Sequence, residues 1–502
     1  MNFENLSSNL ALIKPEIVIS ITLVLIVLFD LIWHKNKKIL PYLSIAGIII
    51  SGYFVTEQFG INSSAFITGL SSKGMIVSDP FGAFFKLIVL LSSLLIILFS
   101  ITSSEIIKTE DRHGEYYTLI FGMILGMFFI VSASNLILIY LSIELLSLSS
   151  YILAGFLKSV KRSTEASLKY LIYGSVASGV MLFGISILFG LTGSINLFDI
   201  NYALQAGQLG GFTFVFAGLL ILGGIGFKIS VAPFHFWTPD VYEGAPITIT
   251  AYLSVASKAA GFALLIRFIK ITFFETVTTN GYWVLLQVID WQSILIALSI
   301  LTMTLGNFAA LWQDNLKRML AYSSIAHAGY LLLAVAIFSN QGLVAVLIYF
   351  GIYLFMNLGA FFVVMLIADK IGSEDMDDYK GKGSSVAFLG IALAIFLLAL
   401  AGLPPTGGFI AKLYIFIALI DAGMIAVAII ALLNTVVAYY YYVRVLKNLY
   451  LVKIDNQESS SIRVSFGNII IILILLIPVM VFGIYFTPLV NLAQSSISLF
   501  GF

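Results

Sequence analysis

The 502-residue sequence contains no cysteine, which excludes disulfide bonds, thiolate metal sites and iron–sulfur ligation. Charged residues are also scarce: they make up only 10% of the chain, against about 25% in soluble domains. The net charge of +1 gives no reason to expect nucleic-acid binding. Hydrophobic residues make up 60% of the chain, which predicts an all-α integral membrane protein whose surface is covered mostly by the lipid bilayer.

A helix needs roughly 20 apolar residues to span a bilayer, and fourteen segments provide them. The long twelfth segment contains Pro404, Pro405, Gly407 and Gly408, so we expect its helix to break in mid-membrane. Pro233, late in the seventh segment, predicts a second broken helix. The fourteen segments are residues 16–33, 39–56, 81–101, 116–133, 135–157, 164–190, 212–237, 246–270, 292–312, 319–338, 341–368, 386–418, 424–443 and 466–487.

Basic residues are divided unevenly between the two sides of the predicted bundle. Seventeen of the 26 lysines and arginines lie in loops that follow odd-numbered segments, and only four lie on the opposite side. The positive-inside rule then predicts a multi-pass protein with the loops after odd-numbered segments in the cytoplasm and both termini on the other side of the membrane, which would be the periplasmic side of a bacterial inner (plasma) membrane. The loop after the seventh segment departs from the pattern, because it holds Asp240, Glu243 and no basic residue. The seventeen are Lys35, Lys37, Lys38, Lys108, Arg112, Lys158, Lys161, Arg162, Lys317, Arg318, Lys370, Lys380, Lys382, Arg444, Lys447, Lys453 and Arg463, and the four are Lys14, Lys73, Arg267 and Lys270.

Five lysines remain inside the predicted spans, where a charge at the bilayer centre costs about 2.5–3.5 kcal/mol. Lys86 lies about 9 Å into the third segment, near enough to its end to snorkel outward, so we expect a structural role. Lys169 is similarly shallow, and Glu165 can pair with it from one turn earlier. For Lys169, a structural and a functional role are equally open.

Lys228 and Lys258 lie near the middle of the seventh and eighth segments, too deep to reach water, and Glu144 is the only carboxylate at a comparable depth. One interpretation is that these charges fix helix packing, but charges on three separate helices are a costly way to do so. Burial disfavours the charged form of a lysine, and an approaching carboxylate favours it. Movement of Glu144 relative to Lys228 would therefore load or unload a proton, which predicts a proton relay.

Three further groups extend this relay. His327 lies in the tenth segment, and His235 follows Lys228 by seven residues. Histidine titrates near neutral pH and suits proton transfer, although a lone histidine in a helix more often serves packing. Lys412 follows the second break, roughly 12 Å from the outer end of its segment, and is placed to be the last charged group before the periplasm.

An internal repeat connects the two halves of the chain. Superposing Tyr140 on Tyr322 gives an offset of 182 residues, and superposing Lys228 on Lys412 gives 184. The superposed pairs are an odd number of spans apart, so the two five-helix halves are expected to be inverted, as in transporters. We predict four regions: N-terminal helices in 1–115, a first repeat in 116–270, an inverted second repeat in 290–445 and a C-terminal helix in 446–502.

Three runs of sequence resemble the antiporter-like membrane subunits of complex I, the respiratory NADH–quinone oxidoreductase. The runs are GFKISVAPFHFWTPDVYEGAP at 226–246, DNLKRMLAYSSIAH at 314–327 and AGLPPTGGFIAK at 401–412. The resemblance extends over essentially the whole chain. The form WTPDVYEGAP and the lysine at 412 look like subunit N, whereas subunit M tends to carry a glutamate at that last position and subunit L is longer.

This resemblance implies a fold of fourteen helices with inverted repeats, in a proton-translocating, non-redox subunit of a multisubunit translocase. It implies that Glu144 and Lys228 are the coupled pair, that Lys258 is the bridging lysine and that Lys412 is the terminal lysine. The expected relay is then Glu144, Lys228, Lys258, His327 and Lys412, with Lys169 and His235 as secondary residues. The chain itself would bind no cofactor or metal; NAD, FMN, iron–sulfur clusters and quinone would be bound by partner subunits, and its membrane partners would be the other complex I membrane subunits.

Two alternatives stay open at this point. A cation/proton antiporter subunit of the Mrp type shares the lysine and carboxylate machinery, so only the detail of the motifs argues against it. A purely structural scaffold predicts that Lys228→Ala leaves proton pumping intact. The acidic stretch from Glu374 to Asp378 is interpreted as a solvated loop rather than a metal site.

Overall fold

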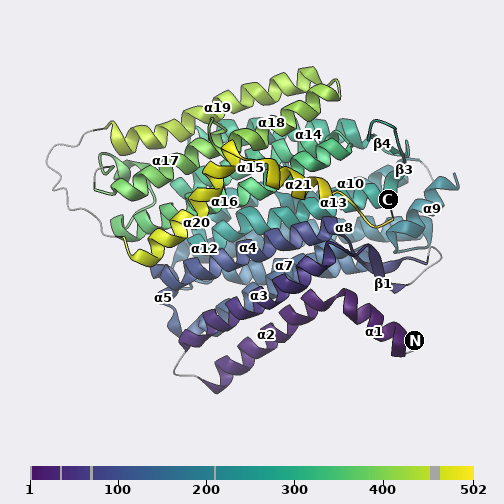
Figure 1. The fold of residues 1–502 in the computed structure, drawn as a ribbon, viewed down its shortest axis with the longest axis horizontal. Helices are drawn as coiled ribbons and strands as arrows, with labels where there is room; N and C mark the ends of the chain where they lie inside the picture. The colour runs from purple at the N-terminus through teal and green to yellow at the C-terminus, as the bar shows by residue number, and fades with distance from the viewer. Residues whose placement is uncertain are drawn as a thin grey trace.

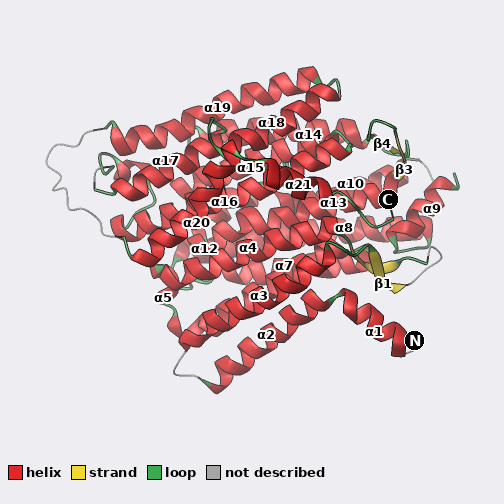
Figure 2. Cartoon of the chain, viewed as in Figure 1, coloured by secondary structure: helices red, strands yellow, loops and turns green. Residues whose placement is uncertain are grey.

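The computed structural model describes residues 3–33, 37–67, 72–207, 211–383, 385–452 and 464–501. Figures 1 and 2 show a bundle of nearly parallel helices with short β-hairpins at one end. Both chain termini lie at that same end, as an even number of crossings requires. The described loops among those that carry the seventeen basic residues lie at the other end, which we call the basic end. Of those residues, Lys35, Lys453 and Arg463 lie outside the described residues.

Within the described residues, thirteen helices are long and apolar enough to cross a membrane. A fourteenth crossing consists of two 15-residue helices, α17 (Ala387–Ala401) and α18 (Gly407–Asp421), each too short to span alone. The predicted fourteen-helix architecture is therefore confirmed. The thirteen are α2 (Lys14–Ile32), α3 (Leu40–Gln58), α4 (Pro80–Thr102), α6 (His113–Ser132), α7 (Leu136–Ala154), α8 (Lys161–Thr192), α10 (Phe212–Ile229), the run α12–η3–α13 (Ile247–Phe273), α14 (Trp291–Ala310), α15 (Leu316–Ala336), α16 (Asn340–Ile371), α19 (Ile425–Tyr450) and α20 (Phe466–Ile484).

Shorter elements connect the spans. The eighth span is interrupted by a π-helical turn, η3 (Leu253–Ser257), between α12 (Ile247–Tyr252) and α13 (Lys258–Phe273). Two antiparallel hairpins, β1–β2 and β3–β4, lie at the end that holds the termini. The remaining short elements are α1 (Phe3–Leu12), η1 (Lys37–Ile39), β1 (Ser63–Ile67), β2 (Gly74–Ser78), α5 (Ser104–Ile107), η2 (Glu110–Arg112), α9 (Leu197–Gln205), α11 (Trp237–Gly244), β3 (Phe274–Val277), β4 (Trp283–Leu285), η4 (Met376–Tyr379) and α21 (Thr487–Ser495).

The two halves of the bundle repeat each other in their packing. A Cβ on Gly126 of α6 would lie 3.0 Å from the carbonyl oxygen of Ser142, and one on Gly306 of α14 would lie 2.9 Å from that of Tyr322. Helices α8 and α16 both have 32 residues, and α7 and α15 both follow an asparagine cap. These correspondences lie about 180 residues apart, so Tyr322 matches Ser142 and not Tyr140. The offsets of 182 and 184 were wrong, and the boundaries of the four regions stay a prediction.

The third span contains a buried ion pair instead of a snorkelling lysine. Lys86 Nζ lies 2.6 Å from Glu16 Oε1 on α2 and donates to Gln58 Oε1 on α3 at 3.0 Å. The Lys86 side chain is only 2% exposed, so the predicted route to water was wrong. Its contacts join three helices, which fits the structural role.

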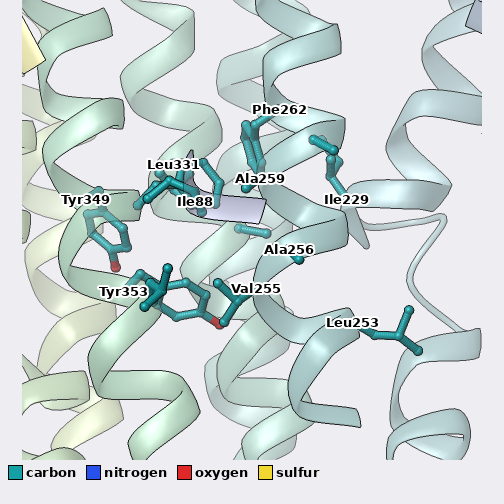
Figure 3. Close-up of a cluster of buried hydrophobic side chains, with 14 of the residues drawn as sticks. Ile88, Ile229, Leu253, Val255, Ala256, Ala259, Phe262, Leu331, Tyr349 and Tyr353 are labelled. Carbon is teal, nitrogen blue, oxygen red and sulfur yellow. The ribbon is translucent and has the colours of Figure 1, made fainter. Parts of the chain in front are cut away.

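Helices α12–α13, α15 and α16 form the centre of the bundle and are buried over almost their whole length. Figure 3 shows the middle of this centre, where Tyr353 of α16 lies beside Val255 of η3. Outer helices such as α8 instead expose apolar side chains, including Leu168, Ile172 and Val176. This distribution leaves the polar groups of the central helices without access to lipid.

Candidate proton-relay site

The first broken helix places Lys228 at a helix end inside the bundle. Helix α10 stops at Ile229 because Ser230 adopts a left-handed conformation (φ 61°) and Pro233 has no N–H to donate. The chain resumes as α11 at Trp237, whose indole Nε1–H donates to the carbonyl of Phe227 at 2.9 Å. Lys228 therefore lies in the last turn of α10, where the carbonyl end of the helix dipole stabilises a positive charge.

Lys228 is 2% exposed and contacts α7. Its Nζ donates to Ser147 Oγ at 3.2 Å and lies 5.9 Å from the centre of the Tyr170 ring. Glu144 lies one turn before Ser147 and interacts electrostatically with Lys228. Among the described residues no ion pair joins the two, and Glu144 Oε1 is buried without a hydrogen-bond partner. The structure thus brings the predicted pair close together, with the lysine bound to a hydroxyl and not to the carboxylate.

The second broken helix gives Lys412 an equivalent environment. Helix α17 ends before Gly402, which has a left-handed φ of 86°, and α18 begins at Gly407 after two prolines. Lys412 Nζ donates to the carbonyl of Ala401, the last residue of α17, at 2.7 Å. Its Nζ also lies 5.1 Å from the centre of the Tyr330 ring. Both lysines therefore lie at the carbonyl end of an interrupted helix, although one comes from the first half-helix and the other from the second.

Lys258 connects the two halves of the bundle. It is the first residue of α13 after the π-helical turn, it is 2% exposed, and its Nζ donates to the carbonyl of Ser324 on α15 at 2.8 Å. The hydroxyl of Tyr353 donates to Ser324 Oγ at 3.0 Å. π-Helical turns occur frequently at functional sites, and this one directly precedes a buried charge.

His327 lies between Lys258 and Lys412. It follows Ser324 by one turn of α15, is 2% exposed and interacts electrostatically with both lysines. Its Nδ1 is hydrogen-bonded to the Tyr349 hydroxyl, and its Nε2 lies 3.2 Å from the Tyr442 hydroxyl. Both ring nitrogens thus contact groups that can accept or donate a proton.

His235 lies in the first break, between α10 and α11. It is 3% exposed, and its Nδ1 has no hydrogen-bond partner among the described side chains and backbone. It also interacts electrostatically with Lys258 of the eighth span.

Lys169 lies apart from these groups, in an ion-pair network at the basic end. Its Nζ contacts Glu165 at 2.8 Å, as expected, and also Asp240 at 2.6 Å. Arg318 of α15 joins Asp240 at 2.6 Å and Glu243 at 2.9 Å. Burial raises the pKa of Asp240, but the hydrogen bonds from Lys169 and Arg318 outweigh this and hold it below its usual value of 3.8. This network explains the acidic residues that follow the first break: Asp240 and Glu243 lie on α11 and not in a loop, and their carboxylates bind basic residues of α8 and α15.

The sequence did not predict the hydroxyl groups that join the charged groups. Ser147 contacts Lys228, Ser324 contacts Lys258, and three tyrosines surround Ser324 and His327. A usable signal was the spacing of Tyr349 and Tyr353, which places two hydroxyls on one face of an apolar helix. Among the described residues, no group of three or more His, Asp or Glu side chains is placed to hold a metal ion.

Comparisons with known proteins agree over the whole chain. Residues 133–438 match the family described as "NADH:quinone oxidoreductase/Mrp antiporter, TM". The chain is 47% identical to NADH-quinone oxidoreductase subunit N 2 of Chloroherpeton thalassium over 97% of this chain and 94% of that protein. It is 43% identical to NADH-quinone oxidoreductase subunit N of Chlorobium chlorochromatii over 99% and 96% of the two chains.

Solved structures show the same architecture. A chain of respiratory complex I from Thermus thermophilus superposes with a TM-score of 0.76 at 26% identity, covering 96% of this chain and 99% of that one. A chain of the Mrp complex from Dietzia superposes with a TM-score of 0.82 over 97% of both chains. The latter is only 18% identical, so it shows a shared fold alone.

Proposed function

Because this chain belongs to the NADH:quinone oxidoreductase/Mrp antiporter family of membrane proteins, and because its similarity to N subunits covers almost its whole length, we propose that it translocates protons as the N-type membrane subunit of an NADH–quinone oxidoreductase. In this proposal it does no redox chemistry. Electron transfer from NADH through FMN and iron–sulfur clusters to quinone takes place in partner subunits, and this chain is assembled with other membrane subunits of the complex.

The observation that supports the proposal best is the series of buried titratable groups across the centre of the bundle. Lys228, Lys258, His327 and Lys412 are each at most 4% exposed, and hydroxyl or carbonyl groups contact all four. The two terminal lysines lie at the carbonyl ends of interrupted helices, a position where transporters bind cations. We infer that protons pass along this series through hydroxyl groups and water, and that Glu144 controls the charge of the first lysine.

The direction of transport follows from the basic end. The excess of lysine and arginine there supports a cytoplasmic assignment, with both termini in the periplasm. Helix α18 runs from the break towards the end that holds the termini, so Lys412 would release protons to that side. Uptake at the basic end and release at the other end would move protons out of the cytoplasm.

The Mrp-type antiporter is the second candidate. Its fold is the same, but its identity to this chain is 18%, against 47% for an N subunit. The full-length similarity to N subunits favours the quinone oxidoreductase.

Inverted membrane vesicles that contain the assembled complex test the proposed function. We expect Lys228→Ala to lower the initial rate of proton pumping during NADH oxidation at least about tenfold, because a positioned proton-transfer group typically contributes more than that to the rate. Lys370→Ala removes an exposed lysine at the basic end and serves as the matched control, with pumping unchanged. Normal pumping by Lys228→Ala, with the complex fully assembled, would favour the scaffold.

A further inference from the structure

A cavity of about 390 Å³ opens at the basic end of the bundle, separate from the relay groups. Its wall combines α5, the starts of α8 and α12, the end of α16 and the loops that follow the ninth and eleventh spans. We call it the basic-end cavity. The charged residues in its wall are Glu105, Lys108, Arg162, Asp369, Glu374 and Asp375.

Glu105 differs from the other carboxylates of this wall in its partners. Glu374 forms an ion pair with Lys317 at 2.8 Å, and Asp369 accepts hydrogen bonds from the backbone and hydroxyl of the neighbouring serine of α5. Glu105 Oε2 accepts one hydrogen bond, from the backbone N–H of Ile247 at 2.9 Å. In the part of the chain that the structure describes, Glu105 has no ion-pair partner, so its charge is not neutralised by a direct contact.

The surroundings of Glu105 favour proton binding. Burial raises the pKa of Glu105; Lys317 and the Ile247 N–H oppose this, and the nearby carboxylates Glu374 and Asp369 add to it. A carboxyl group with a raised pKa holds a proton closer to neutral pH than an ordinary surface glutamate does. Lys108 and Arg162 also line the cavity but do not contact the carboxylate of Glu105 within ion-pair distance.

A series of buried polar groups leads inward from this point along the eighth span. Ile247 begins α12, and Lys258 follows eleven residues later, roughly 16 Å along the helix axis. Between them Thr248, Ser254 and Ser257 are each at most 1% exposed. The hydroxyl of Thr248 accepts a hydrogen bond from a tyrosine of α6 at 2.9 Å, so the first step inward already has two hydroxyl groups.

Helix α16 supplies polar groups that face this series. Asn357 and Tyr353 are four residues apart, which places them on one face of the helix, and Asp369 lies further along α16 in the cavity wall. Asn357 Nδ2 donates to Ser254 Oγ at 2.6 Å, while its Oδ1 is fully buried and has no hydrogen-bond partner. Tyr353 then bonds Ser324, whose carbonyl accepts from Lys258.

We propose that the basic-end cavity is an entrance for protons, in which Glu105 binds protons from the adjacent aqueous side. From Glu105 the protons pass along α12 and α16 to Lys258 without passing Lys228. The inference rests on the proposed proton translocation and adds a second entry to it. The polar groups along α12 and α16 would pass protons together with water molecules, since the unpartnered Oδ1 of Asn357 offers a hydrogen-bond acceptor midway between Glu105 and Lys258. Two entries would let Lys258 be reprotonated while Lys228 is occupied by its interaction with Glu144.

Glu105→Gln in inverted vesicles tests this entry, because these vesicles expose the basic end to the medium. The glutamine keeps an oxygen that can accept from the Ile247 N–H but cannot bind a proton at working pH. We expect the initial pumping rate at about pH 8 to fall roughly tenfold, and the deficit to shrink at about pH 6, where protons are more abundant. Glu115→Gln, at an exposed glutamate of the same end, is the matched control and should pump normally.

The pH dependence separates proton uptake from a structural role of Glu105. A structural role would lower pumping equally at both pH values, and that result would overturn the proposal. Wild-type pumping by Glu105→Gln at both values would also overturn it. In either case, loss of pumping by Lys228→Ala in the same preparation would leave the proposed function standing. If the complex with Glu105→Gln does not assemble, Ala368→Phe tests the proposal instead, because the phenylalanine fills part of the cavity from α16. The same pH-dependent loss of pumping supports proton entry through the cavity, and unchanged pumping contradicts it.

Discussion

The ion pair between Arg267 and Asp79 provides a quantitative test of how the helix that carries Lys258 is held in place. Arg267 lies on α13, nine residues after Lys258, and is 0% exposed. Its two terminal nitrogens each bind one oxygen of Asp79 at 2.8 Å, and its Nε donates to the carbonyl of Val131 at 2.8 Å. Asp79 also accepts from the backbone of Phe500 at 3.0 Å, so one carboxylate joins α13, α4 and the C-terminal segment.

Arg267→Met should destabilise the subunit strongly. Removing one partner of a buried pair costs about 3–5 kcal/mol, because the remaining charge stays buried without compensation. The double variant Arg267→Met with Asp79→Asn removes both charges, and the asparagine can still accept the backbone hydrogen bond at the start of α4. We therefore expect the double variant to be more stable than Arg267→Met alone by at least about 1–2 kcal/mol.

Unfolding of the complex by SDS in mixed micelles, followed by release of this subunit, measures these free energies. The comparison needs wild type, both single variants and the double variant, so that the coupling energy of the pair is obtained directly. A cost below about 1 kcal/mol for Arg267→Met, or additive effects of the two substitutions, would refute the reasoning.

Two further predictions concern the second break and the ion-pair network. Gly402→Ala should reduce the rate of proton pumping several-fold although all charges are retained. The new Cβ would lie 2.7 Å from Lys412 Cδ, and the left-handed backbone disfavours alanine by about 1–2 kcal/mol. Pumping assays on the wild type and the variant measure this loss. Asp240→Asn should lower the thermal stability of the detergent-solubilised complex at neutral pH. Because the pKa of Asp240 is held below 3.8, the ionised carboxylate contributes its full stabilisation of the folded subunit above about pH 4 and loses it as the pH falls through the folded-state pKa. The difference in thermal stability between Asp240→Asn and the wild type should therefore disappear in acid. A difference that persists unchanged in acid contradicts this role of Asp240.

The spans and breaks could be predicted because they depend on local properties of the chain. Apolar length determines which segments cross the bilayer, and proline removes backbone donors wherever it occurs. The depth of Lys228 and Lys258 followed from the same count along the helices. These features need no knowledge of which helices touch.

The errors came from contacts between distant segments. Distance along one helix suggested that Lys86 reaches water, but Glu16 lies beside it on another helix. Arg267 was assigned to a helix end facing the outer side, and it is fully buried against Asp79. The register of the repeat was wrong by two to four residues because a short sequence match has little precision, whereas the close approach of Gly126 to α7 and of Gly306 to α15 fixes it.

The relation between the two terminal lysines also depended on tertiary structure. Sequence placed Lys228 before one break and Lys412 after the other, which looked like an imperfect repeat. In the fold, Lys412 reaches back to the carbonyl of Ala401, so both ammonium groups occupy the end of a first half-helix. The equivalence lies in the position of the charge and not in the position of the residue.

The most direct test of the relay is the number of protons moved per NADH oxidised by an assembled complex that carries Lys258→Met. Lys258 Nζ on α13 donates to the carbonyl of Ser324 on α15 and so links the two halves, and its loss should leave this subunit unable to pass protons from one side to the other. We predict a drop in the proton-to-electron ratio that is not increased further by Lys412→Ala in the same complex. A ratio equal to that of the wild type would contradict a proton path through the centre of this protein.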